Sequence, residues 1–221
     1  MAGWGEFSAA FGVFFLSHSL LVRPPVKAWL VARLGPVGFT IGYSLLSLGV
    51  LAWVIMAAGR APFVPLWNWA AWQGHVTLSA MLAVCLILGL SIGRPNPFSF
   101  GGGGYARFDP ARPGIVRLTR HPMLFALALW AIGHLVPNGD LAHVILFGSF
   151  AGFALMGGAL IDRRKRRVMG EGWARLDRAR QAAWPVPRSL GESVVRVLLG
   201  LWLYTILLGA HPYLFGVSPL R

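Results

Sequence analysis

Six apolar runs constrain the fold of this chain more than any other feature of its sequence. They cover residues 4–22, 36–58, 72–92, 121–136, 141–161 and 194–210. A membrane-spanning helix needs about 20 apolar residues, because the hydrocarbon core is about 30 Å thick. Hydrophobic residues make up 56% of the chain and charged residues only 12%, which excludes a soluble domain. The sequence predicts an all-α integral membrane protein, a single bundle of about six transmembrane helices forming one domain over residues 1–221.

The basic residues alternate from one connection to the next. Residues 23–33, 94–120 and 163–196 hold 18 of the 20 Lys and Arg residues, and the other connections hold almost none. Cytoplasmic loops are enriched in Lys and Arg. The pattern therefore predicts that these three connections are cytoplasmic basic loops and that both termini lie outside. The net charge of +13 is explained by this topology, so it does not indicate a nucleic-acid partner.

Two pairs of glycines predict close helix packing in the bilayer. Gly38 and Gly42 lie four residues apart in the second run, and Gly148 and Gly152 have the same spacing in the fifth. Small residues at this spacing allow two helix backbones to approach each other.

The predicted topology brings two histidines to a similar depth. His18 lies about one turn before the cytoplasmic end of the first run, and His121 lies at the cytoplasmic start of the fourth. Two neutral imidazoles at one depth can ligate one metal from opposite sides, and haem iron takes its axial ligands singly from separate elements. Arg23, Arg117 and Arg120 lie nearby and suit the propionates of a haem. The alternative is structural: His18 bonds a neighbouring helix and His121 caps its own.

The other four histidines fall on the outer side in the same topology. They are His75, His134, His143 and His211. They begin or end apolar runs, where polar residues are tolerated, so a second metal site is the weaker interpretation. His134 follows His121 by 13 residues, or about 20 Å of helix, so one residue cannot serve both sites.

Several short motifs resemble the NnrU family of membrane proteins. The two most informative are His18-Ser19 followed by Arg23, and Arg120-His121-Pro122. The resemblance covers most of the chain up to about residue 185, and the last apolar run is not distinctive. The motifs lie at residues 14–19, 23–26, 43–48, 61–67, 96–99, 119–123, 129–135, 138–141 and 161–165.

The resemblance implies a location, a cofactor and two possible roles. Bacterial members are multi-pass proteins of the inner (cytoplasmic) membrane linked to denitrification and nitric oxide metabolism. The family also includes the plant 15-cis-zeta-carotene isomerase, a haem b enzyme whose two ligand motifs match those of His18 and His121. We therefore expect haem b, held by His18 and His121, with a lipophilic polyene or nitric oxide as substrate or ligand. If the protein is an enzyme, the resemblance implies a haem-dependent isomerase.

Two other functions stay open at this level. Arg120-His121-Pro122, followed after the next apolar run by Gly170-Glu171-Gly172-Trp173, resembles membrane methyltransferases that enclose S-adenosylmethionine between such segments. The downstream acidic segment is thin here, because five cations follow Asp162 and Glu171 stands alone. A non-enzymatic membrane scaffold is the third interpretation.

Overall fold

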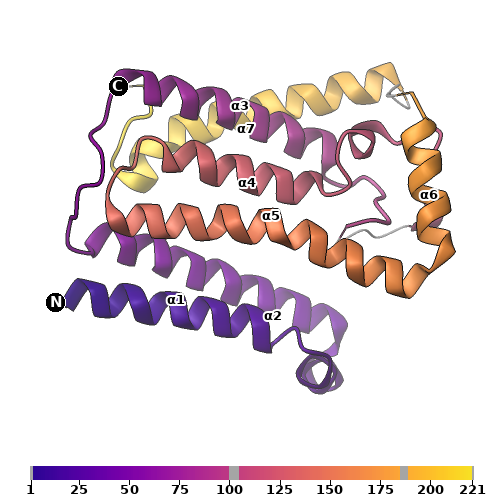
Figure 1. Cartoon of the computed structure of the whole chain (residues 1–221), viewed down its shortest axis with the longest axis horizontal. Coiled ribbons are helices and arrows are strands. Elements are labelled where there is room, and N and C mark those ends of the chain that lie inside the picture. The colour runs from indigo at the N-terminus through magenta and orange to yellow at the C-terminus, as the bar shows by residue number, and fades with distance from the viewer. Residues whose placement is uncertain (1, 100–104, 185–188, 221) are drawn as a thin grey trace. The chain divides into compact units, whose positions relative to one another are not determined.

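The computed structural model describes residues 2–99, 105–184 and 189–220, and these residues are helical with no β-strand. Gly101–Gly104 of the third connection, Arg188 and Arg221 lie outside the described residues. The elements follow the chain as shown in Figure 1. They are α1 (Ala2–Leu20), α2 (Pro24–Arg60), α3 (Ala71–Ser91), η1 (Tyr105–Arg107), η2 (Gly114–Arg117), α4 (Pro122–Leu135), α5 (Leu141–Met169), α6 (Glu171–Ala182) and α7 (Leu190–Phe215).

Four of these helices are long and apolar enough to cross a membrane, which makes this a multi-pass membrane protein. They are α2, α3, α5 and α7. Helices also occupy the two other predicted spans, but α4 has only 14 residues. At 1.5 Å per residue it is about 21 Å long, shorter than the hydrocarbon core. The 19-residue α1 contains Glu6 and His18 and does not qualify either. The described residues thus support four spans directly, and the count of six stays a prediction.

Two connections that were expected to be loops are helical. The segment 24–34 forms the first part of α2, which bends at Gly35 (φ 70°, ψ 165°) before Pro36. Only glycine adopts that φ readily, and the proline that follows cannot donate a helical hydrogen bond. The basic run 162–167 continues α5 to Met169, and α6 begins after Gly170.

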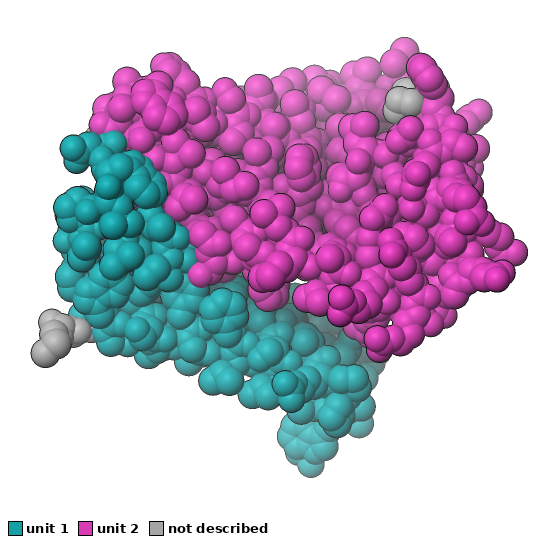
Figure 2. Space-filling model, in the orientation of Figure 1, with its two compact units in different colours: residues 1–68, 139–146 teal, residues 69–138, 147–221 magenta. Residues whose placement is uncertain are grey.

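The chain forms two compact units, coloured separately in Figure 2. Unit 1 contains residues 1–68 and 139–146, and unit 2 contains residues 69–138 and 147–221. The single domain expected over the whole chain stays a prediction.

Unit 1 is built on the packing of α1 against α2. Glu6 near the start of α1 accepts hydrogen bonds from Arg60 (Nε to Oε2, 3.1 Å) and from Trp53 (Nε1 to Oε1, 3.2 Å) near the end of α2. The two helices are therefore antiparallel. Ala10 of α1 and Val54 of α2 are completely buried. The segment after α2 pairs with the turn before α5, where Leu66 N donates to the carbonyl of Gly139 at 2.7 Å.

Unit 2 is organised around α3, which contacts both α4 and α7. A Cβ on Gly200 of α7 would lie 2.8 Å from the carbonyl oxygen of Cys85 in α3, so the two backbones meet there. Thr77 of α3 donates to the carbonyl of Gly133 in α4 at 2.8 Å. The glycines that the sequence singled out do not have this role. A Cβ at Gly42, Gly148 or Gly152 would meet no atom within 4 Å in the described structure, and at Gly38 only Leu34 of the same helix.

Candidate functional site

A small core outside the long helices supports the candidate site in unit 2. Phe98, Val116 and Trp173 are almost fully buried and pack together, with Phe98 and Trp173 in an edge-to-face contact at 6.0 Å. The core therefore joins the segment before η1, η2 and α6. It fixes the chain around residues 119–122, which lead into α4.

His121 is buried and held on both sides of its ring. Its Nε2 lies 3.0 Å from Oδ1 of Asp162 in α5, and its Nδ1 lies 3.3 Å from the hydroxyl of Ser99. Because a carboxylate only accepts hydrogen bonds, Nε2 carries the proton and Nδ1 carries the lone pair of the neutral ring. A Cβ on Gly158 would lie 3.1 Å from Cδ2 of His121, so the ring packs closely against the α5 backbone. His121 precedes α4 but its side chain does not cap that helix.

Arg120 shares Asp162 with His121. Its Nε and Nη2 donate to Oδ2 at 3.0 and 2.6 Å, and its Nη1 lies 3.5 Å from Asp177 of α6. Burial disfavours the guanidinium charge, but the bonds and charges of these two carboxylates outweigh it and raise the pKa of Arg120. The carbonyl of Arg120 accepts a hydrogen bond from Asn96 at 2.9 Å. Arg120 thus binds acidic side chains within the protein.

Asp177 and Arg180 fasten α6 to η2. Arg180 donates to Asp177 at 2.8 Å and, through Nη1, to the carbonyls of Val116 (3.0 Å) and Arg117 (2.8 Å). Both side chains are buried. Arg117 donates from Nε to the carbonyl of Ala183 at 2.9 Å, so it holds the end of α6. The site is therefore one connected network rather than a set of separate cations.

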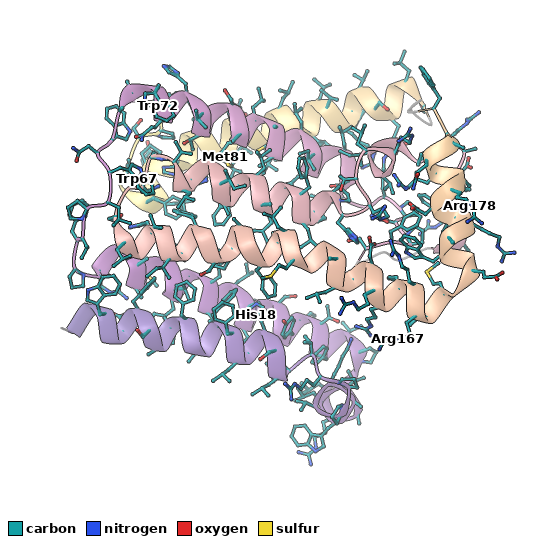
Figure 3. The ribbon with its side chains drawn as sticks, viewed as in Figure 1. His18, Trp67, Trp72, Met81, Arg167 and Arg178 are labelled. Atoms are coloured by element: carbon teal, nitrogen blue, oxygen red, sulfur yellow. The ribbon has the colours of Figure 1, made fainter. Side chains whose placement is uncertain are left out.

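His18 lies in unit 1, on α1 (Figure 3). Its Nδ1 donates to the carbonyl of Phe14 at 2.8 Å, so Nε2 carries the lone pair of the neutral ring. The bond is to its own helix and not to a neighbour. The ring stacks on Phe14 at 4.1 Å and meets Tyr43 of α2 at 5.9 Å. Arg23 is exposed beyond the end of α1.

The predicted ligands therefore belong to different units, with His18 in unit 1 and His121 in unit 2. A metal shared by the two rings stays a prediction. Each ring nevertheless has what a ligating histidine requires. One ring nitrogen donates to an oxygen acceptor, and the other keeps its lone pair.

His75, His134, His143 and His211 do not join other potential ligands in a metal cluster within the described part of the chain. His134 and His211 stack with ring centroids 6.5 Å apart, and each donates from Nδ1 to a backbone carbonyl. His143 bonds Asp140 at 2.7 Å. Among the described residues, no three His, Cys, Asp or Glu side chains gather as a metal site.

Several residues of the network were missed by reasoning from the sequence. Asn96 and Ser99 lie in one of the short family motifs, residues 96–99, but their residue types gave no reason to place them beside His121. Asp162 did carry a signal, because it is one of only seven acidic residues and ends an apolar run. Its five cationic neighbours hid that signal, since they indicated a solvated basic stretch.

The segments that the methyltransferase interpretation requires do meet in unit 2. Residues 120–121 contact Asp162 and Asp177, which lie on either side of Gly170-Glu171-Gly172 in the sequence. Both carboxylates are occupied by arginine or histidine, however, so neither is presented to a ligand.

The comparison with protein families agrees with the motifs. The family model described as NnrU protein matches residues 6–219. The match includes α7, which had seemed undistinctive, and confirms the resemblance over nearly the whole chain. No curated protein and no solved structure matches the chain. The chain therefore belongs to the NnrU family.

Proposed function

We propose that this NnrU protein binds haem b in a bacterial inner membrane and that His18 and His121 would hold its iron. The observation that carries the proposal is the pairing of His121 with Asp162 at 3.0 Å. A carboxylate on the far nitrogen of a ligating histidine fixes the tautomer and makes the ring more basic. His18 has the corresponding arrangement, with a backbone carbonyl on its Nδ1.

The surrounding residues have separate roles in this proposal. Asp162 orients the His121 ring, and Arg120 donates to the same carboxylate and pairs with its charge. Ser99 must give up its contact with Nδ1 of His121 for that nitrogen to ligate, and at 3.3 Å this contact is long. Phe14 and Tyr43 give His18 an aromatic surrounding that suits a flat apolar ring system.

The three arginines predicted to pair with the haem propionates are not equally suited to that role. Arg23 is exposed and its guanidinium can pair with a carboxylate. The Nε of Arg117 donates to the carbonyl of Ala183, and the guanidinium has further N–H donors. Arg120 is already paired with two acidic residues, so it acts on the site through Asp162.

Haem b, when bound, supplies an iron centre that takes a diatomic ligand or acts on a polyene double bond. Membership of the NnrU family favours a role in nitric oxide metabolism linked to denitrification. A variant of this proposal is isomerisation of a lipophilic polyene, which the resemblance to the carotenoid enzyme implies. For such a substrate, the exposed apolar faces of the long helices offer entry from the bilayer.

Absorption spectra of the detergent-purified protein test this proposal. We expect a b-type Soret band that is lost in both His18→Ala and His121→Ala and kept in the control His75→Ala. Circular dichroism shows whether each variant keeps its helices. A protein without pigment after expression with a haem precursor would contradict the proposal, and so would a band that survives both substitutions.

Methyl transfer is the second candidate, because Arg120 of the Arg-His-Pro motif lies beside Asp177 of α6. The test is calorimetric titration of the purified protein with S-adenosylmethionine. Stoichiometric binding without a Soret band would support this candidate. Absence of both signals would leave a membrane scaffold.

A further inference from the structure

We propose that a cleft in unit 2, at the ends of α3 and α7, binds a phosphate group. The cleft has a volume of about 220 Å³ and is lined by Arg94, Arg107, Arg112 and Arg196. Asp109 and Glu192 are its acidic residues. Since one water occupies about 30 Å³ in the liquid, a phosphate group fits with its bound water. This site uses none of the residues assigned to haem.

Two of the arginines form a fixed wall of the cleft. Arg196 donates from Nε to Glu192 at 2.8 Å and from Nη1 to the carbonyl of Ile92, at the end of α3, also at 2.8 Å. Glu192 also lies 3.4 Å from Nη2 of Arg94. The side chains of Arg94 and Arg196 are only 11% and 18% exposed. One carboxylate therefore serves two buried guanidinium groups, which leaves positive charge on this wall.

The other two arginines of the cleft face solvent. Arg107 and Arg112 are exposed, and in the part of the chain that the structure describes no carboxylate lies within 4.0 Å of either. Asp109 directs Oδ1 to the backbone N–H of Ala111, so it shapes the loop between them. Four arginines against two carboxylates leave an excess of two positive charges. Arginine forks match the oxygens of a phosphate group.

The backbone at Gly114 also leaves room for the buried guanidinium of Arg94. Gly114 has φ +57°, and a Cβ at that position would collide with Nη1 of Arg94. Glycine therefore lets Arg94 lie against the start of η2 and reach the cleft.

The surroundings of the cleft favour a phosphate that is attached to lipid. Exposed apolar side chains lie beside it at the end of α3 and the start of α7, among them Ile92 (56%), Leu190 (76%) and Val194 (50%). The predicted topology puts these helix ends at the inner leaflet, which is rich in anionic lipid. Basic pockets between membrane helices on that side bind anionic headgroups. A soluble phosphate compound would present the same group to the four arginines.

The test compares the variant Arg107→Gln/Arg112→Gln with a control of equal charge, Arg175→Gln/Arg178→Gln, on α6. All four side chains are exposed, and Figure 3 shows Arg178 on α6, outside the cleft lining. The full-length protein in neutral detergent is titrated with phosphatidylglycerol, phosphatidylcholine and pyrophosphate, and binding is followed by native mass spectrometry and calorimetry. Circular dichroism checks that both variants are folded.

We expect the wild type to prefer phosphatidylglycerol over phosphatidylcholine. The cleft variant should lose about 30-fold in affinity for phosphatidylglycerol, and the control should change little. Pyrophosphate binding that depends on Arg107 and Arg112, without any lipid preference, would assign the cleft to a soluble phosphate compound. If the cleft variant binds each probe as the control does, the proposal is wrong.

Discussion

Asp162 is the residue on which the candidate site depends most. Asp162 as a whole is 7% exposed, and its carboxylate accepts hydrogen bonds from Arg120 and His121 at the same time. A buried charge is tolerated when its partners satisfy it, and loss of one partner leaves the other charge uncompensated. The arrangement therefore links the orientation of His121 to the charge of Arg120.

Asp162→Asn should lower the stability of unit 2. The amide keeps the shape of the side chain but removes the charge that Arg120 needs, leaving that guanidinium with Asp177 at 3.5 Å. We expect unfolding in detergent to become easier by about 2–4 kcal/mol. Thermal unfolding measured by circular dichroism checks this. The matched control is Glu171→Gln, because Glu171 is exposed and lies on the same connection. Equal melting temperatures for the two variants would refute the role of Asp162.

At the scale of elements, close backbone contacts decide which helices pack together. The contact between α3 and α7 depends on glycine, because both Gly89 and Gly200 lie against the backbone of the partner helix. In a membrane, helix association relies on such close packing, since lipid tails are as apolar as the side chains.

Gly200→Ala should loosen the packing of α7 on α3. The added methyl group would lie 2.8 Å from the carbonyl oxygen of Cys85, and one helix must move to accommodate it. Overpacking of this kind costs about 1–3 kcal/mol. Gly209→Ala is the control. Gly209 lies on the same helix, and a Cβ there would meet nothing within 4 Å. The melting temperature in detergent should fall for Gly200→Ala alone. Helix propensity would raise the melting temperature of both variants, because Ala favours a helix more than Gly does. An equal change in the two variants would therefore contradict the packing role of Gly200.

At the scale of the whole molecule, the surface is that of a membrane protein. Only 6% of the most apolar window of α7 is buried within the protein, and large side chains such as Leu198 and Trp202 are more than half exposed. These faces need lipid around them. The remaining question at this scale is whether the short helix α4 crosses the bilayer.

Cysteine labelling of intact cells answers that question. Cys85 is the chain's single cysteine and is fully buried, so introduced thiols dominate the signal. If α4 crosses, Asn138→Cys reacts with a membrane-impermeant maleimide from outside, whereas Arg112→Cys and Lys27→Cys react only after the cells are opened. Protection of both Asn138→Cys and Arg112→Cys in intact cells would show that α4 does not cross.

The sequence by itself determined the membrane character, the helical class, the family and the main helix positions. Apolar runs and the alternation of Arg and Lys are local properties, and a bilayer imposes helices on them. It also predicted His121 and Arg120 as site residues, and that part stays a prediction. The fourth apolar run, residues 121–136, already indicated a short α4. The helical start of α2 was not foreseen, because a basic connection does not tell where a helix begins.

Only the tertiary structure decided the partners of those site residues. Asp162 is 41 positions from His121, and Ser99 is 22, so nothing local relates them. The same holds for the glycines. Gly38 and Gly42 have the favourable spacing, yet the close contact lies at Gly200, because packing depends on which helix face meets a neighbour. Spacing along a chain indicates what a residue is able to do, and the fold selects which residue does it.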